Sequence, residues 1–404
     1  MSAQSTANPD APMTAASGDR LTPYEIMEKL VSFPTVSRDS NLPLIDWVED
    51  YLKQNGVPTY RHLHSDQPKA GLWAHAGPMK EGGLVLSGHT DVVPVDGQDW
   101  SSDPFTVETR DGRYYGRGCA DMKSFDALAI WAVVEAQHRG IARPLQVALT
   151  YDEEVGLLGA DPLIKDAAGK FPKASAAIIG EPTMMQAVTG HKGGLAFDVH
   201  MRGYEVHSSM SHKGVSAIME AAKIIEWANE MNAASAAATP GPKAAPFDPA
   251  WTNVHVGTIE GGTAHNITAK DCHFVLSFRI VPGDTHEQWE TAFRAKVAEV
   301  EAGMKAIHPD AGITLTKKFG GPGLVPEDAG EAEAVVRRIT GDNGTHVVSY
   351  GTEAGYFQRH GFSAVVCGPG DIAQAHQPDE FITIDQFNAG HAFMERLLDS
   401  LSEG

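Results

Sequence analysis

The stretch Leu84-Val-Leu-Ser-Gly-His-Thr-Asp-Val-Val-Pro-Val95 decides how the rest of the chain is interpreted. Its apolar start, 84–86, predicts a buried strand that ends at the following Ser-Gly pair. His89 and Asp91 therefore stand where strand gives way to loop, which is where open α/β sheets bind ligands. In extended chain the two side chains point the same way, so the carboxylate could orient the imidazole or join it on a metal. The same pair is also common in solvated turns.

The composition is that of an ordinary globular protein. Of 404 residues, 42% are hydrophobic and 21% charged, and this length is typical of about two or three domains. There are 52 acidic and 32 basic residues, and the formal charge of −20 argues against nucleic acid or an anionic membrane as partner. No apolar segment is long enough to span a bilayer. The three cysteines are far apart, which favours a reducing, cytoplasmic compartment over a disulfide framework.

Acidic side chains follow two further predicted strands directly. The strand 145–151 runs into three adjacent acids, Asp152 to Glu154, and the strand 176–179 runs into Glu181. Adjacent carboxylates repel one another, so they either spread into water or surround a cation. Because the strands belong to one predicted sheet, their acids should gather with His89 at one edge.

Two more candidates lie in loops. Asp121 follows a Gly-rich segment, 116–120, and precedes an apolar helix expected at 124–138. It could be a ligand, or an acid placed favourably at a helix N-terminus. His376 follows the Gly-rich loop 368–371 and precedes a proline, where packing does not require an imidazole. It is either a ligand or a surface histidine.

The hydrophobic pattern predicts an α/β domain with a second domain inserted into it. The first should comprise 20–188 and 321–404, with a mixed central sheet and helices on both faces, and residues 1–19 should form a disordered tail. Within it, helices are expected at 24–31, 42–54 and 386–400, and the strands 72–74 and 84–86 should form a hairpin.

The insert, 189–320, should be a small α+β sandwich. Four strands and two helices are expected in the ferredoxin-like order βαββαβ. Their ranges are 195–201, 215–231, 254–259, 272–280, 285–306 and 313–317. The Ala- and Pro-rich stretch 233–249 is expected to be loop.

Taken together, five segments resemble the metal-site motifs of a known family. In chain order they are 88–94, 116–123, 152–156, 180–183 and 375–378. They resemble those of the co-catalytic di-zinc family of acetylornithine deacetylase, succinyl-diaminopimelate desuccinylase, aminoacylase and glutamate carboxypeptidase. The resemblance covers almost everything from Thr22 onward. It implies a zinc-peptidase-like catalytic domain and an inserted dimerisation domain.

The resemblance also implies a metal site. It implies two Zn²⁺ ions per subunit, which Co²⁺ or Mn²⁺ could replace, sharing one carboxylate. The implied ligands are His89 and Glu181 on one ion, Glu154 and His376 on the other, and Asp121 between them. Asp91 would orient His89, and Glu153 would act as the general base.

Further residues are implied to bind substrate. His207 of the insert would stabilise the oxyanion in the partner subunit's site, although it could be an ordinary loop residue. Asn266 and Arg279 would hold the substrate's carboxylate, although Arg279 could pair with Asp284 instead. In the catalytic domain, Gly370 is a further substrate-binding candidate. Glu353 either binds a substrate ammonium or is a helix N-terminal acid.

These assignments lead to an expected activity. The resemblance implies a homodimer that hydrolyses the amide of a small-molecule N-acyl amino acid. The segments 254–264 and 351–354 are most similar to acetylornithine deacetylases, which implies that N2-acetyl-L-ornithine is cleaved to L-ornithine and acetate, a step of arginine biosynthesis. The alternatives are a desuccinylase, aminoacylase or dipeptidase of the same family, or a non-catalytic binding member.

Overall fold

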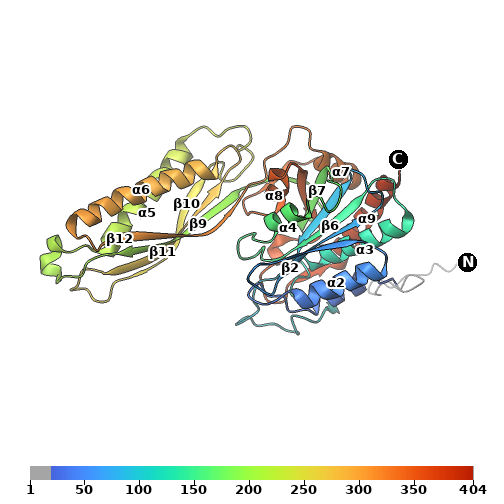
Figure 1. Ribbon diagram of the computed structural model, residues 1–404, viewed down its shortest axis with the longest axis horizontal. Coiled ribbons are helices and arrows are strands. Elements are labelled where there is room, and N and C mark those ends of the chain that lie inside the picture. The colour runs from blue at the N-terminus through green and yellow to red at the C-terminus, as the bar shows by residue number, and fades with distance from the viewer. Residues whose placement is uncertain (1–19, 404) are drawn as a thin grey trace, which may run out of the picture. The chain divides into compact units, whose positions relative to one another are not determined.

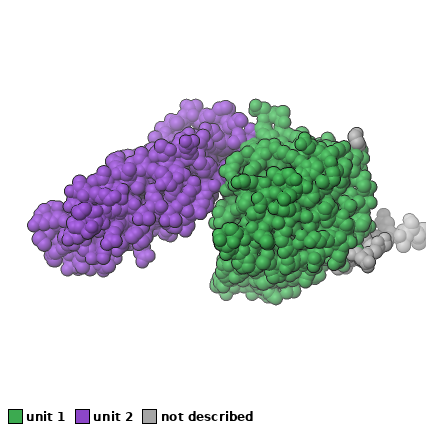
Figure 2. All heavy atoms as spheres, in the orientation of Figure 1, with its two compact units in different colours: residues 1–189, 327–346, 352–404 green, residues 190–326, 347–351 purple. Residues whose placement is uncertain are grey.

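The computed structural model describes residues 20–403, which form two compact units (Figure 2). Unit 1 runs to Thr189 and continues through Glu327–His346 and from Thr352 onward. Unit 2 comprises Gly190–Pro326 and Val347–Gly351, so it interrupts unit 1 in the chain. The tail predicted at 1–19 lies outside the described residues. Within 20–403, no helix is both long and apolar enough to cross a membrane.

A mixed eight-stranded sheet forms the centre of the larger fold. Its strands, in spatial order, are β1 (Thr59–Leu63), β2 (Ala70–Ala76), β6 (Leu145–Thr150), β3 (Leu84–His89), β7 (Ala176–Pro182), β14 (Ser363–Gly368), β8 (Val188–His191) and β13 (His346–Val348). β3 runs parallel to both β6 and β7, and β14 runs parallel to β7. The mixed α/β sheet predicted from the sequence is confirmed, and its parallel centre brings the ends of β3, β6 and β7 to one edge.

Helices cover both faces of this sheet. They are α1 (Pro23–Val31), α2 (Leu42–Gln54), α3 (Lys123–Arg139), α4 (Ala160–Ala167), α7 (Glu331–Thr340), α8 (Ala354–Arg359) and α9 (Ile384–Ser402). On one face, α3 packs on β2, β3 and β6, with α1 and α9 beside it. On the other face, Gly71 of β2 allows close approach of Leu163 from α4, and Trp73 contacts Phe357 of α8.

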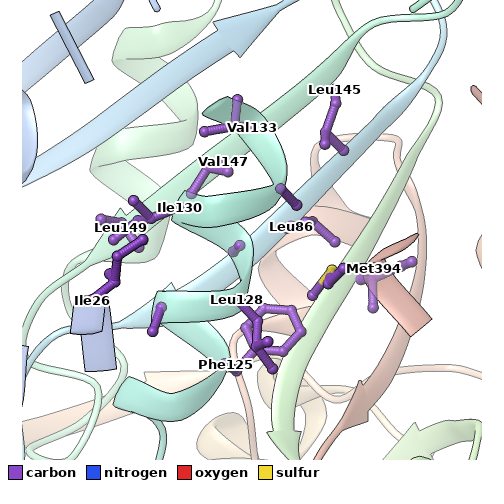
Figure 3. Close-up of a cluster of buried hydrophobic side chains, with 14 of the residues drawn as sticks. Ile26, Leu86, Phe125, Leu128, Ile130, Val133, Leu145, Val147, Leu149 and Met394 are labelled. Carbon is purple, nitrogen blue, oxygen red and sulfur yellow. The ribbon is translucent and has the colours of Figure 1, made fainter. Parts of the chain in front are cut away.

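The core of unit 1 is centred on α3 (Figure 3). This helix is buried on nearly all sides because its sequence is apolar around its whole circumference. The side chains that meet there include Ile26, Leu86, Phe125, Leu128, Ile130, Val133, Leu145, Val147, Leu149 and Met394. Gly180 of β7 leaves room for Phe125, since a Cβ at this position would lie 1.9 Å from the ring. The helix that follows Asp121 is thereby fixed against the strands that carry His89 and Glu181.

The hairpin predicted between 72–74 and 84–86 is wrong. β6 lies between β2 and β3 and pairs with both of them. All six residues of β6 are buried, and a strand that is buried on both faces belongs in the interior of a sheet. The glycines between β2 and β3 are typical of a hairpin turn, but the pairing of both strands with β6, which comes later in the chain, decides the topology.

Unit 2 is a four-stranded antiparallel sheet with two helices. Its elements are β9 (Gly193–Arg202), α5 (Ala217–Ala237), β10 (Asn253–Gly261), β11 (Asp271–Ile280), α6 (His286–Ile307) and β12 (Gly312–Gly321). The spatial strand order is β10-β11-β9-β12, and the chain order is the expected βαββαβ. Both helices pack on one face of the sheet (Figure 1).

Two smaller expectations were wrong. The stretch 233–249 is not all loop, because α5 continues to Ala237. Alanine is the best helix former, and the first proline in that stretch is Pro240. Glu181 does not follow its strand but lies inside it, since β7 extends to Pro182 through pairing with β14.

Candidate metal centre

Six titratable side chains converge at the carboxyl ends of β3, β6 and β7. They are His89 at the end of β3, Glu153 and Glu154 after β6, Glu181 in β7, Asp121 before α3, and His376 after the short 3-10 helix η2 (Ile372–Gln374). All of the metal-ligand candidates named from the sequence are therefore neighbours in space.

Asp121 lies between the two imidazoles. Its Oδ1 is 3.0 Å from Nε2 of His89, and its Oδ2 is 3.2 Å from Nε2 of His376. Beyond His89, Oε1 of Glu181 lies 3.9 Å from the same Nε2. Beyond His376, Oε1 of Glu154 lies 3.1 Å from that Nε2. Two donor groups, each with an imidazole and a carboxylate, thus share the two oxygens of one aspartate.

The charge of this cluster favours cations. Burial and the neighbouring Glu181 raise the pKa of Glu153 well above its usual value. Burial and Asp121 do the same to the pKa of Glu181. Although burial acts to raise it, hydrogen bonds with His376 and His89 hold the pKa of Asp121 below its usual value. Crowded buried carboxylates need positive charge close by.

The donor set fits divalent metal ions. One oxygen or nitrogen from each of His89, Glu153 and Glu181 lies within 4.8 Å of the others, and the same holds for His89, Asp121 and Glu154. Imidazole nitrogens and carboxylate oxygens are the ligands of catalytic zinc sites. The residues present are therefore suited to hold two ions that share Asp121.

Asp91 anchors the site from behind. Nδ1 of His89 lies 2.9 Å from the backbone oxygen of Asp91, which can only accept, so the ring is protonated there and Nε2 is free as a ligand. The Asp91 carboxylate accepts hydrogen bonds from the backbone N–H groups of Glu153 (3.1 Å) and Glu154 (3.4 Å) and from the Ser37 hydroxyl (2.7 Å). Asp91 therefore positions the loop after β6 through its carboxylate and the imidazole through its backbone oxygen.

Asp152 is excluded from the centre by its own partner. Its carboxylate forms a buried ion pair with Lys69, whose ammonium also donates to the backbone oxygen of Ser37. The question left open by three adjacent acids is thus resolved. One acid is neutralised by a lysine, and the other two face the cluster.

Glu380 is a supporting residue that the sequence did not reveal. Its Oε1 accepts backbone hydrogen bonds from Gly118 (3.0 Å), Ala120 (2.8 Å) and Asp121 (3.1 Å). Its Oε2 lies 2.6 Å from Nη1 of Arg117, and both side chains are 1% exposed. An acid in a polar loop resembles a solvated residue, so only the fold could show that Glu380 holds the loop carrying Asp121.

Glu353 lies in the interior. It occupies the N-cap position of α8 but its side chain makes no capping hydrogen bond. It is 1% exposed, and burial raises the pKa of its carboxyl to about 7. A substrate ammonium would have to reach this buried carboxylate, and the role of Glu353 in binding it stays a prediction. Gly370, at φ +90°, donates its N–H to Gln386.

The three remaining candidates are exposed residues of unit 2. His207 caps the 3-10 helix η1 (Ser208–Lys213), and its Nδ1 accepts from the Ser209 backbone N–H at 3.2 Å. The backbone oxygen of Asn266 accepts from Ser208 at 2.9 Å, which ties the two loops together. Arg279 lies on β11. Asp284 accepts from Thr252 and Trp289, and within residues 20–403 it forms no ion pair with Arg279.

Comparison with known proteins identifies a family and similar folds. The sequence profile of peptidase family M20/M25/M40 matches residues 85–400. An acetylornithine deacetylase of Myxococcus xanthus is 33% identical over 385 residues, 92% of this chain and 95% of that protein. An M20 family metallo-carboxypeptidase of Sulfolobus solfataricus superposes with a TM-score of 0.75 at 17% identity, covering 94% and 99% of the two chains. A dinuclear metal binding M20 peptidase of Bacillus subtilis superposes with a TM-score of 0.61 at 14% identity, covering 94% of this chain and 97% of that one.

Proposed function

The chain belongs to peptidase family M20/M25/M40, and on that premise we propose that it hydrolyses N2-acetyl-L-ornithine to L-ornithine and acetate. Family and relatives alike indicate a metal-dependent hydrolase of amide bonds. The observation that carries the proposal is Asp121, whose two oxygens face His89 and His376 separately. This is the arrangement that two ions with a shared carboxylate need.

We assign the ligands as the sequence suggested. His89 and Glu181 would hold one ion, Glu154 and His376 the other, and Asp121 both. The ions, Zn²⁺ with Co²⁺ or Mn²⁺ as replacements, would polarise the acyl carbonyl and increase the acidity of water. Asp91 keeps His89 in the tautomer that leaves Nε2 available to a metal.

Glu153 is the proposed general base. It neighbours a ligand position without being needed as one, and its backbone is held by Asp91. Its carboxylate would take a proton from the attacking water and return it to the nitrogen of the leaving amine as the amide C–N bond breaks. The products are then a carboxylic acid and a free amine, and the acid passes its proton to the amine or to solvent.

Unit 2 would complete the site in a homodimer. We propose that its exposed His207 stabilises the oxyanion in the partner's site, and that Asn266 and Arg279 bind the substrate carboxylate. The three cysteines, Cys119, Cys272 and Cys367, are buried and free, which supports a cytoplasmic setting in arginine biosynthesis.

The test is a substrate panel on full-length protein reconstituted with zinc. N2-acetyl-L-ornithine should give the highest kcat/KM, compared with N-succinyl-diaminopimelate, N-acetyl-methionine and a dipeptide. A higher value for one of the other three would assign the chain to that activity within the family. Glu153→Gln serves as the control for background hydrolysis, and no turnover of any substrate would favour a binding protein.

A further inference from the structure

A row of polar side chains crosses the sheet of unit 2. His200 of β9 stands directly opposite His273 of β11, and His273 stands directly opposite Glu260 of β10. Side chains that are directly opposite in antiparallel strands have Cβ atoms about 4.5–5.5 Å apart. Asp271 lies two residues before His273 on β11 and therefore on the same face. Four potential ligands from three adjacent strands thus gather on one surface.

This surface is open. α5 and α6 pack on the sheet's other face, as Figure 1 shows. Over the row lies a hollow of about 370 Å³, whose lining includes His200, His273, Glu260 and Thr314. An ion could therefore enter from solvent without any rearrangement of the backbone.

The imidazoles and the carboxylate are already close. Nε2 of His200 is 2.8 Å from Oδ1 of Asp271, and the rings of His200 and His273 are stacked with centroids 4.1 Å apart. One ligand atom from each of the three residues lies within 4.8 Å of the others. The ligand atoms of a tetrahedral zinc ion are roughly 3.3 Å apart, given bonds of about 2.0 Å. Side-chain rotations alone can close that difference.

We propose that His200, His273 and Asp271 form a third metal site, distinct from the catalytic centre, with Glu260 as the fourth ligand. Two imidazoles with carboxylates select a borderline transition metal such as Zn²⁺ over Mg²⁺ or Ca²⁺, which prefer oxygen ligands alone. With ligands from β9, β10 and β11, the ion cross-links three of the four strands. The site is thus structural, and it holds the open face of the sheet.

The test counts metal ions on the full-length chain. Chelator-stripped wild-type protein and the double variant His200→Ala, His273→Ala are compared by equilibrium dialysis against Zn²⁺. The double variant should bind one ion fewer per chain. Single variants should weaken that ion about 100-fold or more, because losing even an outer hydrogen-bond partner of a ligand costs about 10- to 100-fold. Glu260→Gln should weaken it less.

A matched control lies on the same sheet. His255 of β10 is exposed and pairs with Ser277, four residues along β11 from His273 and so roughly 13 Å away. His255→Ala should leave the ion count unchanged. With Cu²⁺ as a spectroscopic probe, electron paramagnetic resonance should show coupling to two imidazole nitrogens that the double variant lacks.

Two results would overturn the proposal. One is an equal ion count in the wild type and the double variant. The other is a third ion bound more weakly than about 100 μM, which would mark a stacked surface pair without a metal role. Neither outcome depends on hydrolytic activity, because these residues lie outside the proposed catalytic machinery.

Discussion

Replacement of Glu380 tests whether the metal centre depends on a carboxylate that binds no metal. Glu380→Ala removes the acceptor for three backbone N–H groups, those of Gly118, Ala120 and Asp121, and leaves the buried charge of Arg117 without its carboxylate partner. Breaking a buried ion pair by removing one member costs about 3–5 kcal/mol. The lost backbone hydrogen bonds belong to the same network, so we expect a total loss near this range. Glu380→Gln should lose less, since its amide oxygen can still accept the three N–H groups.

The assay is urea unfolding of chelated full-length protein, followed by zinc titration of the folded variants. We expect zinc affinity to fall at least about 10-fold in Glu380→Gln, because a neutral amide accepts the three N–H groups more weakly than a carboxylate and no longer pairs with Arg117, which loosens the loop that carries Asp121. Glu108→Ala is the matched control. It breaks a 3.0 Å pair with Arg110 that is partly exposed, and should cost less than about 1 kcal/mol. If the free energy of unfolding of Glu380→Ala lies within about 1 kcal/mol of the wild-type value and the variant binds zinc equally well, the supporting role of Glu380 is refuted.

Three further predictions concern the catalytic centre, and a fourth concerns the buried histidine His191. Chelation should abolish hydrolysis, and elemental analysis of Asp121→Ala should show loss of most of the metal; full activity of metal-free protein would contradict the assignment. Glu153→Gln should keep both ions while kcat falls about 10²- to 10⁴-fold, and loss of metal would mean that it is a ligand. Mixing Glu153→Gln with His207→Ala under subunit exchange should restore activity, and none despite proven exchange would argue against a shared site. Burial lowers the pKa of His191 to about 4. Between pH 6.5 and pH 4 the unfolded chain therefore binds one proton more than the folded chain, and the free energy of unfolding falls by up to about 3 kcal/mol as the pH is lowered. In His191→Gln, urea unfolding should show a smaller fall of this free energy over the same pH range, and an unchanged pH dependence would contradict the prediction.

The ligand candidates could be predicted because their chemistry is local in the sequence. His89 ends one strand, and Glu154 lies four residues after the end of another. In a sheet with a parallel centre, such positions must meet at one edge, so the strand pattern alone brings them together. The same reasoning works even where a boundary is misplaced. Glu181 lies inside β7 rather than after it, yet it reaches the same edge.

The supporting groups could not be predicted because their roles are defined by distant partners. Glu380 acts on backbone groups about 260 positions earlier in the chain, and Lys69 neutralises Asp152 across 83 positions. Neither residue has a local pattern that separates it from a solvated charge. The hairpin failed for the same reason, since the strand between β2 and β3 comes later in the sequence. Local sequence patterns indicate which residues could bind a metal, whereas only long-range contacts show which other residues hold them in place.

This difference changes the interpretation of Asp91. The sequence assigned it one task, the orientation of His89, yet its carboxylate lies 3.6 Å from the ring and is closer to the backbone N–H groups of Glu153 and Glu154. Because those two glutamates are adjacent, their side chains diverge, and one anchor fixes the proposed base and a proposed ligand together. Glu380 fixes the loop of Asp121 in the same manner. The geometry of the centre is therefore set by two carboxylates that accept backbone hydrogen bonds, and changes to either should disturb metal binding and proton transfer together.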